Sequence, residues 1–168
     1  MAGAIVRGLA ICAALYASAD AAERTAAEVW LTISPRALAA LIVSEGGEAE
    51  VQVGAEDTIL GGVVDGTPYE VYFYDCDGGA FAGPATPDSA CLSFEYRAYF
   101  EGYPDDGEIV NAYNDAYQYG GLWRDGSGDL ALQLNVIVEG GVTDANLGAS
   151  FAWWRAVLAS FHDFMEER

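Results

Sequence analysis

The stretch CLSFEYRAYF, residues 91–100, decides the fold class of this chain. Apolar and more polar residues alternate along it. The apolar set comprises Leu92, Phe94, Tyr96, Ala98 and Phe100, and the polar set comprises Ser93, Glu95, Arg97 and Tyr99. Successive side chains of a strand point to opposite faces of a sheet, so this period of two predicts a half-buried antiparallel strand.

Further strands are predicted on both sides of this one. YEVYFYDC, residues 69–76, shows the same period, and Asp65-Gly66 before it is a typical hairpin turn. A second hairpin is predicted around DGSG, residues 125–128. The predicted strands are residues 50–53, 58–64, 69–76, 91–100, 122–124 and 130–138, while EVWLTI at 28–33 is either an extended lead-in or a short strand.

Three helices complete the pattern. The first begins at Pro35 with Ser34 as N-cap and ends before Gly46-Gly47. The second covers residues 107–117, with Ile109, Tyr113 and Ala116 on its inner side, and the third begins after Thr143. Apolar residues recur in the third helix at spacings of three and four: Phe151, Trp154, Leu158, Phe161 and Met165. This order predicts an α+β fold, a curved antiparallel sheet of five to six strands with three helices packed on it.

The first 21 residues have the pattern of a secretory signal peptide. Arg7 precedes an uncharged run at residues 8–17, and small residues follow up to Ala21. Cleavage is expected after Ala21, with Ala19 as the alternative; a lipoprotein signal at Cys12 and a buried N-terminal helix are the other interpretations. We therefore expect one domain over residues 22–168 in a secreted or periplasmic protein.

The charge of the chain limits its partners and its chemistry. Twenty-six acidic residues against seven arginines, with no lysine, give a net charge of −19. Such a surface repels phosphate backbones and anionic lipid headgroups, so we expect neither nucleic acid nor a membrane as partner. P-loop, Schiff-base and pyridoxal-phosphate enzymes need a lysine, so these classes are excluded.

Two cysteines remain after the expected signal cleavage. Cys76 and Cys91 bracket a loop of fourteen residues between two predicted strands. A metal clip, a redox centre and a catalytic nucleophile are alternatives, but no C-x-x-C motif is present to lower a thiol pKa. In an oxidising compartment the pair predicts a structural disulfide, which would contribute about 3 kcal/mol in the chain-entropy model.

No motif points to a metal, a cofactor or a catalytic group. Two cysteines and His162 cannot supply the usual four zinc ligands. The acidic turns at 75–78 and 125–129 lack the glycine and glutamate that a calcium loop requires, so turn chemistry explains them. We expect His162 to be a solvated residue near the helix end, and we expect no cofactor.

Aromatic residues offer the main functional lead. Tyr72, Tyr74, Tyr96, Tyr99 and Trp123 lie in predicted strands. They could form a stacking or protein-binding surface, since aromatic residues are enriched at interfaces. Packing in the core and on the sheet faces is the alternative interpretation.

Several segments resemble the YbjN family, whose members are labelled bacterial sensory transduction regulators. They are DGTPYEVYFYDC (65–76), CLSFEYRAYF (91–100) and IVNAYNDAYQYGGLWRDGSGDLALQLNVIVEGGVT (109–143), and the similarity covers residues 34–164. Its most specific parts are Asn111 and Asn114, three residues apart, followed by Asp125 and Asp129 in the second hairpin. Tyr113 stands where the family commonly has tryptophan, and QYGG at 118–121 replaces a more basic turn.

The resemblance implies a fold similar to type III secretion chaperones, frequent dimerisation and no established enzymatic activity. The residues it singles out as surface candidates are Asn111, Asn114, Tyr113, Trp123, Asp125 and Asp129. Together with the missing catalytic motifs, it predicts a non-enzymatic exported binding module with an unknown protein partner and with a homodimer as one arrangement. A protein that binds a small ligand or cation and an uncharacterised hydrolase are the alternatives.

Overall fold

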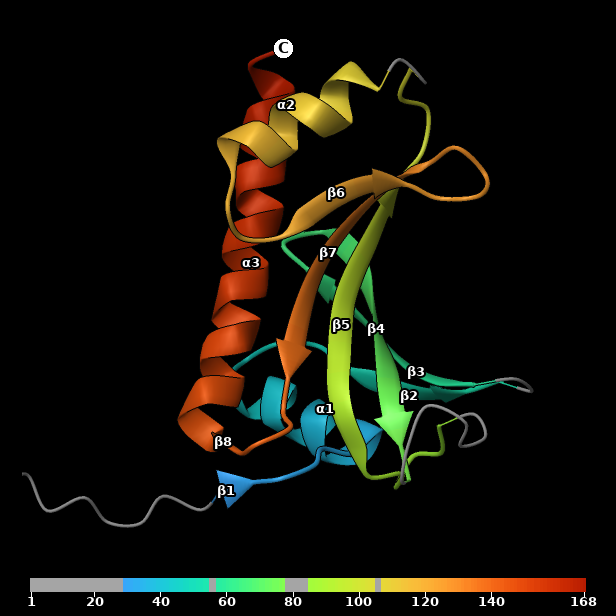
Figure 1. Cartoon of the computed structure of the whole chain (residues 1–168), viewed down its shortest axis with the longest axis vertical. Coiled ribbons are helices and arrows are strands. Elements are labelled where there is room, and N and C mark those ends of the chain that lie inside the picture. The colour runs from blue at the N-terminus through green and yellow to red at the C-terminus, as the bar shows by residue number, and fades with distance from the viewer. Residues whose placement is uncertain (1–28, 55–56, 78–84, 105–106) are drawn as a thin grey trace, which may run out of the picture.

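The computed structural model describes residues 29–54, 57–77, 85–104 and 107–168 (Figure 1). The predicted signal peptide at 1–21 lies outside these ranges, so export stays a prediction. The elements in chain order are β1 (Val29–Trp30), α1 (Pro35–Ser44), β2 (Glu50–Val53), β3 (Thr58–Val64), β4 (Thr67–Cys76), β5 (Cys91–Phe100), α2 (Glu108–Ala116), β6 (Gly121–Arg124), β7 (Leu130–Ile137), β8 (Val142–Thr143) and α3 (Asp144–Glu166).

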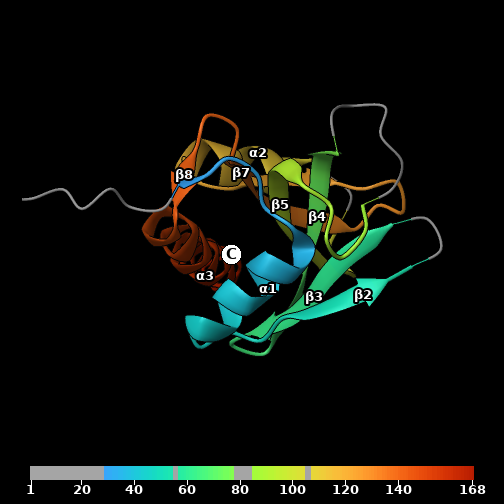
Figure 2. The same ribbon diagram turned by 90° about the horizontal axis from the view of Figure 1, so that it is seen from below.

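Six of the strands form one antiparallel sheet with the order β2-β3-β4-β5-β7-β6. The sheet is curved and does not close, so β2 and β6 are its two edges (Figure 2). β1 and β8 form a separate pair in which Val29 lies opposite Thr143. The predicted α+β fold with five to six strands and three helices is confirmed, and EVWLTI contains the short strand β1.

The helices α1 and α3 lie on the same face of the sheet, inside its curve (Figure 2). α3 contributes the buried residues Phe151, Trp154, Val157, Leu158 and Phe161, whereas Met165 is only partly buried. The Trp154 ring stacks on Tyr96 of β5, with 5.7 Å between the ring centroids. Each buried side chain of this size contributes about 1.5–3 kcal/mol, so this row of residues holds α3 on the sheet.

In the central strands β4 and β5, every second side chain points towards α1 and α3 and is buried in the core. In β4 and β5 the inward residues are at most 5% exposed: Tyr69, Val71, Phe73, Phe94, Tyr96 and Ala98. The residues between them face away from the helices. The alternation in residues 91–100 therefore predicts correctly which side chains of β5 face the helices and which face away from them.

Hydrogen bonds from side chains fix the starts of α1 and α3. The Ser34 hydroxyl accepts from the Ala37 N–H at 3.2 Å. The Thr143 hydroxyl accepts from the Asn146 N–H at 3.2 Å, and the Asn146 side chain accepts from the Thr143 N–H at 3.4 Å. Both N-caps lie where the sequence predicts them, because N–H groups in the first turn have no partner within the helix.

In the described part of the chain, no helix is long and apolar enough to cross a bilayer.

The helix α2 is shorter than predicted. Ile109 and Tyr113 are buried as expected, but Ala116 is exposed, so its predicted inward position is wrong. The reason is that Ala116 is the last helical residue and the backbone becomes extended at Tyr117. Only the first two turns of α2 therefore contribute to the core.

Candidate functional site: an aromatic sheet face around one arginine

The face of the sheet opposite α1 and α3 carries aromatic side chains from three strands. Tyr72 and Tyr74 come from β4, Tyr99 from β5 and Trp123 from β6. The strand register places them around Arg97, which also lies on β5. We call these five residues the tyrosine face.

Arg97 lies at the centre of this face. Its guanidinium carbon is 4.4 Å from the ring centroid of Tyr72, 5.3 Å from that of Trp123 and 6.0 Å from that of Tyr99. A cation within about 6 Å of an aromatic ring is attracted to its electron-rich face. Arg97 therefore ties together rings that belong to three different strands.

A buried carboxylate neutralises this arginine. Arg97 donates from Nε to Glu95 Oε1 at 2.6 Å, and its Nη2 lies 2.6 Å from the same oxygen. Glu95 is only 6% exposed although it lies on the outer face. The guanidinium also donates to the hydroxyls of Tyr99, at 3.1 Å, and Tyr74, at 3.2 Å. Charge-assisted hydrogen bonds of this kind fix both side chains in one geometry.

Hydrogen bonds also position the tyrosines. The Tyr72 hydroxyl donates to Glu70 and lies 3.4 Å from the Tyr99 hydroxyl. The Tyr74 hydroxyl lies 3.2 Å from Glu95 Oε2. The two carboxylates, the three hydroxyls and Arg97 thus form one connected network.

The environment keeps Arg97 charged and Tyr72 neutral. Burial lowers the pKa of Arg97, but the hydrogen bonds to Glu95 and Tyr99 outweigh burial and raise the pKa above its usual value. Burial, followed by the hydrogen bond to Glu70, raises the pKa of Tyr72 well above its usual range. A tyrosine with a raised pKa is a poor nucleophile and a poor base at neutral pH. Tyr72 is therefore suited to contact and hydrogen bonding rather than to attack on a substrate.

Apolar surface remains exposed around the polar network. Tyr74 is 39% exposed and Tyr99 is 38% exposed. Val63 of β3 and Ile137 of β7 lie on the same side of the sheet and are 41% and 69% exposed. Large exposed side chains on one sheet face are typical of an interaction surface.

Tyr96 does not belong to this surface. It is fully buried between Phe94, Phe151 and Trp154, so its interpretation as part of a binding surface is wrong. The physical reason is the two-residue period, which turns Tyr96 inward and its neighbours Glu95 and Arg97 outward.

Glu70 and Glu95 were not singled out by the sequence analysis. Their signal was present, because Glu95 lies in the same alternating set as Arg97 and Tyr99. The sequence alone does not give the strand register, which pairs Glu70 with Arg97 and Tyr72 with Glu95 and so brings both carboxylates to the tyrosine face.

The two asparagines of the resemblance have different environments. Asn114 reaches from α2 to β6, where its amide bonds to both main-chain groups of Leu122 at 2.9 Å. Both asparagines are exposed, and Asn111 lies one turn before Asn114 on the helix. Tyr113 between them is fully buried, so it is a core residue and not a surface candidate. Asn114 therefore has a structural role at the sheet edge.

The hairpin between β6 and β7 is held by its own acidic residues. Asp125 Oδ1 accepts from the Ser127 N–H at 2.8 Å and from the Asp129 N–H at 3.0 Å. The Ser127 hydroxyl donates to Asp129 Oδ2 at 2.9 Å. These bonds are those of an Asx turn, as turn chemistry predicts. Trp123 precedes this hairpin and joins the tyrosine face.

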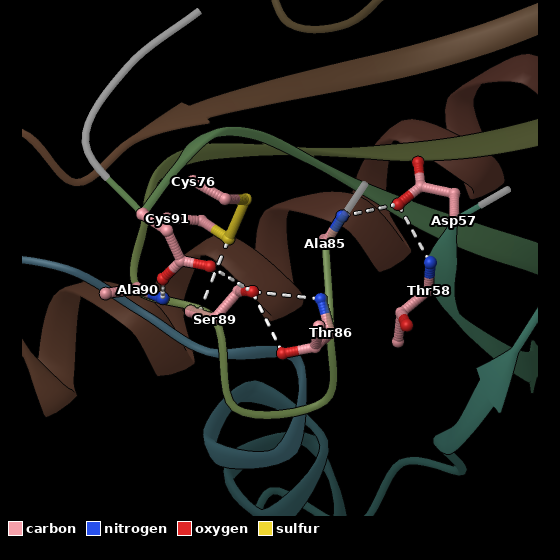
Figure 3. The surroundings of a disulfide bond; sticks show 9 residues. Asp57, Thr58, Cys76, Ala85, Thr86, Ser89, Ala90 and Cys91 are labelled. Carbon is pink, nitrogen blue, oxygen red and sulfur yellow. Dashed lines mark hydrogen bonds between the residues drawn. A yellow bond between two sulfur atoms is a disulfide. The ribbon is translucent and has the colours of Figure 1, made fainter. Parts of the chain in front are cut away.

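Cys76 and Cys91 form a disulfide at the ends of β4 and β5 (Figure 3). They lie directly opposite each other in the strand register, and they are 6% and 0% exposed. The predicted pairing is therefore present in the structure, and burial keeps both sulfur atoms away from solvent.

Two aspartates, Asp77 and Asp57, anchor the chain beside the disulfide, and Figure 3 labels Asp57 with its partners Thr58 and Ala85. Asp77 accepts from the Ser89 hydroxyl at 2.5 Å and from the Ala90 N–H at 2.9 Å. Asp57 accepts from the N–H groups of Thr58, at 2.8 Å, and Ala85, at 3.1 Å. The hydrogen bonds to Ser89 and Ala90 lower the pKa of Asp77, so it is ionised at neutral pH.

His162 has a partner that the sequence analysis did not predict. Its Nε2 lies 2.9 Å from the Thr67 hydroxyl, and its ring meets Phe100 edge to face. It is exposed as expected, but it is bound to β4 rather than only solvated at the helix end. The bond connects α3 to the start of β4.

The described residues offer no metal centre, and the groove beside α1 is mainly apolar. Among them, no group of three or more His, Cys, Asp or Glu side chains could hold a metal ion. A groove of about 450 Å³ beside α1 and the start of α3 is lined mainly by apolar residues such as Trp30 and Leu41. Its titratable lining residues are Glu45 and Asp144, and Asp144 accepts a hydrogen bond from the Trp30 indole.

Comparison with known proteins identifies the family of the chain. No curated protein matches it. The model of the family YbjN, "Putative bacterial sensory transduction regulator", matches residues 34–167 and thus covers the tyrosine face, the disulfide and the helices α1, α2 and α3. Because this match spans most of the chain, the protein belongs to the YbjN family, which is described as regulators rather than as enzymes.

Proposed function

We propose that this chain is a non-enzymatic, exported binding module that acts by contacting a protein partner through its tyrosine face. The observation that carries the proposal is Arg97, which holds Tyr72, Tyr99 and Trp123 in place while parts of the rings stay exposed. Tyrosine, tryptophan and arginine are the residue types that dominate binding energy at interfaces. A preorganised face loses little side-chain entropy when a partner binds.

The regulatory description of the family supports a role in binding rather than in catalysis. Export is supported by the signal-peptide pattern at residues 1–21 and by a disulfide, since disulfides persist in oxidising compartments. N-terminal sequencing of the secreted or periplasmic protein should begin after Ala21 or Ala19. An intact Met1 on cytosolic protein would contradict export, and it would leave the proposal for the tyrosine face unaffected.

Photo-crosslinking in the native cell tests the binding surface. A benzophenone amino acid at position 99 or 74 should give a discrete adduct with another protein. The same group at position 153 is the control, because Trp153 is 50% exposed but lies on α3, away from this face. Tyr74→Ala and Tyr99→Ala together should weaken partner recovery about tenfold or more, as loss of an interface centre does.

The opposite result is equally specific. Adducts at position 153 with none at 74 or 99, or undiminished partner recovery by the double alanine variant, would overturn the assignment of the face. Far-UV circular dichroism of the variant shows whether the fold is retained.

A further inference from the structure

The two edges of the six-stranded sheet differ. At β6, the Asn114 side chain satisfies the main-chain groups of Leu122 that point away from the sheet. At β2, among the residues that the structure describes, no hydrogen bond reaches the main-chain groups that point away from β3. An uncovered strand edge is a template for pairing with another chain.

The register identifies the groups that are open on β2. The Gly54 N–H donates to the Asp57 carbonyl at 2.8 Å, which makes Gly54 and Asp57 a hydrogen-bonded pair. Such pairs alternate along an antiparallel ladder, so Glu50 and Gln52 also bond towards β3. The N–H and C=O groups of the residues between them, Val51 and Val53, therefore point outward from the sheet.

The side chains of β2 do little to protect this edge. Natural sheet edges are commonly blocked by charged side chains, proline or a bulge. The strand sequence EVQV contains no lysine and no proline, and its one charged residue is Glu50 at the first position. Val53 is 69% exposed. The edge thus combines free main-chain groups with an exposed apolar side chain.

The charge next to the edge identifies what would fit there. A groove of about 420 Å³ lies beside β2 and β3, and its lining includes the exposed residues Glu48 and Glu50 together with Gly61 and Gly62. Neither strand contains a basic residue. A second copy of the chain would bring the same carboxylates and another net charge of −19 to this place. A segment with lysine or arginine side chains is complementary to it instead.

We propose that β2 accepts an extended, basic segment of a partner protein as a seventh strand of the sheet. The main-chain groups of Val51 and Val53 pair with the segment, and its basic side chains lie towards Glu48 and Glu50. The proposal shares with the proposed function only the assumption of a protein partner, since β2 is a separate surface from the tyrosine face.

Two short peptides are the probes for this edge. One alternates valine with lysine and the other alternates valine with glutamate, and both are acetylated and amidated. In heteronuclear NMR spectra the basic peptide should shift the Val51 and Val53 amides saturably and slow their hydrogen exchange, and the acidic peptide should do neither. Val51→Pro, which removes an outward N–H, should weaken binding about tenfold, whereas Val51→Thr keeps the N–H and should bind within about twofold.

Charge variants test the same edge without altering its backbone. Glu48→Gln with Glu50→Gln should weaken binding of the basic peptide about fivefold and reduce its salt dependence. The matched control is Glu139→Gln with Glu166→Gln, which removes two exposed carboxylates from other parts of the surface and should leave binding unchanged. If Val51→Pro fails to fold, the comparison of the Glu48/Glu50 variant with the Glu139/Glu166 variant still tests the edge.

Three results would overturn the edge proposal. Shifts confined to the tyrosine face and insensitive to Val51→Pro would place the basic segment there, which would support the proposed function and reject the edge. A dimer in sedimentation velocity that Val51→Pro dissolves would make a second copy the occupant. Absence of saturable binding up to millimolar peptide would reject the edge while leaving the crosslinking test of the tyrosine face unaffected.

Discussion

The side chain of Asn114 bonds to both main-chain groups of Leu122. Its Nδ2 donates to the Leu122 carbonyl and its Oδ1 accepts from the Leu122 N–H, each at 2.9 Å. A neighbouring strand would make the same two bonds, so the amide replaces a strand at the β6 edge. This contact explains why an asparagine on a helix matters to a sheet.

Replacement of Asn114 should destabilise the fold. Asn114→Ala leaves the polar groups of Leu122, a residue 2% exposed, without their partners, and we expect a loss of about 1–3 kcal/mol in the free energy of unfolding. Urea denaturation measures this change. Asn111→Ala is the control on the same helix and should stay within about 0.5 kcal/mol, because the side chain that bonds to Leu122 is that of Asn114. Equal effects of the two substitutions would contradict the edge role.

The pair of Arg97 and Glu95 should behave as one unit. Arg97→Met leaves a carboxylate that is 6% exposed without its cation, and the expected cost is about 3–5 kcal/mol. Adding Glu95→Gln should recover part of that loss, because no buried charge then remains unpaired. A double-mutant cycle in urea measures the coupling, and strictly additive effects would show that the two groups do not interact.

Removal of the disulfide should lower stability without abolishing the fold. Cys76→Ala with Cys91→Ala opens a link between residues 15 apart, for which the chain-entropy model gives about 3 kcal/mol. Guanidinium unfolding of the variant and of the oxidised parent measures the difference. Dithiothreitol should destabilise the parent to a similar extent and leave the double variant unchanged.

Two buried tyrosines should make the protein sensitive to alkali. Burial raises the pKa of Tyr69 to about 12 and that of Tyr113 to about 12, from 10.0. A raised pKa in the folded state favours the neutral hydroxyl, so this contribution is fully present below pH 10 and is lost as the pH rises towards 12. Absorbance at 295 nm and far-UV circular dichroism should therefore show late tyrosine ionisation together with unfolding.

Single phenylalanine variants provide the control for this titration. Tyr69→Phe and Tyr113→Phe should each remove one late-titrating group and shift the unfolding midpoint to higher pH. If all tyrosines ionise near pH 10 in the folded protein, the burial argument is wrong.

Local patterns in the sequence account for much of this fold. The alternation in residues 91–100 predicts which side of β5 faces the helices, and Ser34 and Thr143 predict the starts of α1 and α3. Such features involve residues close in the chain, so the period of a strand and the unpaired N–H groups of a helix start determine them. The disulfide between Cys76 and Cys91 is predictable for the same reason, because each cysteine ends one of the two predicted strands that flank the loop.

The candidate site depends on contacts between distant parts of the chain. Arg97 contacts Tyr72 and Trp123 only because the strand register aligns β4, β5, β7 and β6. Asn114 contacts Leu122 only because α2 packs beside the edge of the sheet. The sequence by itself determined the three helices, the six strands of the main sheet, most of their inward residues and the family resemblance. The tertiary structure decided which polar residues share the outer face and which edge stays open, because strand order and register are set by packing of the whole core rather than by neighbouring residues.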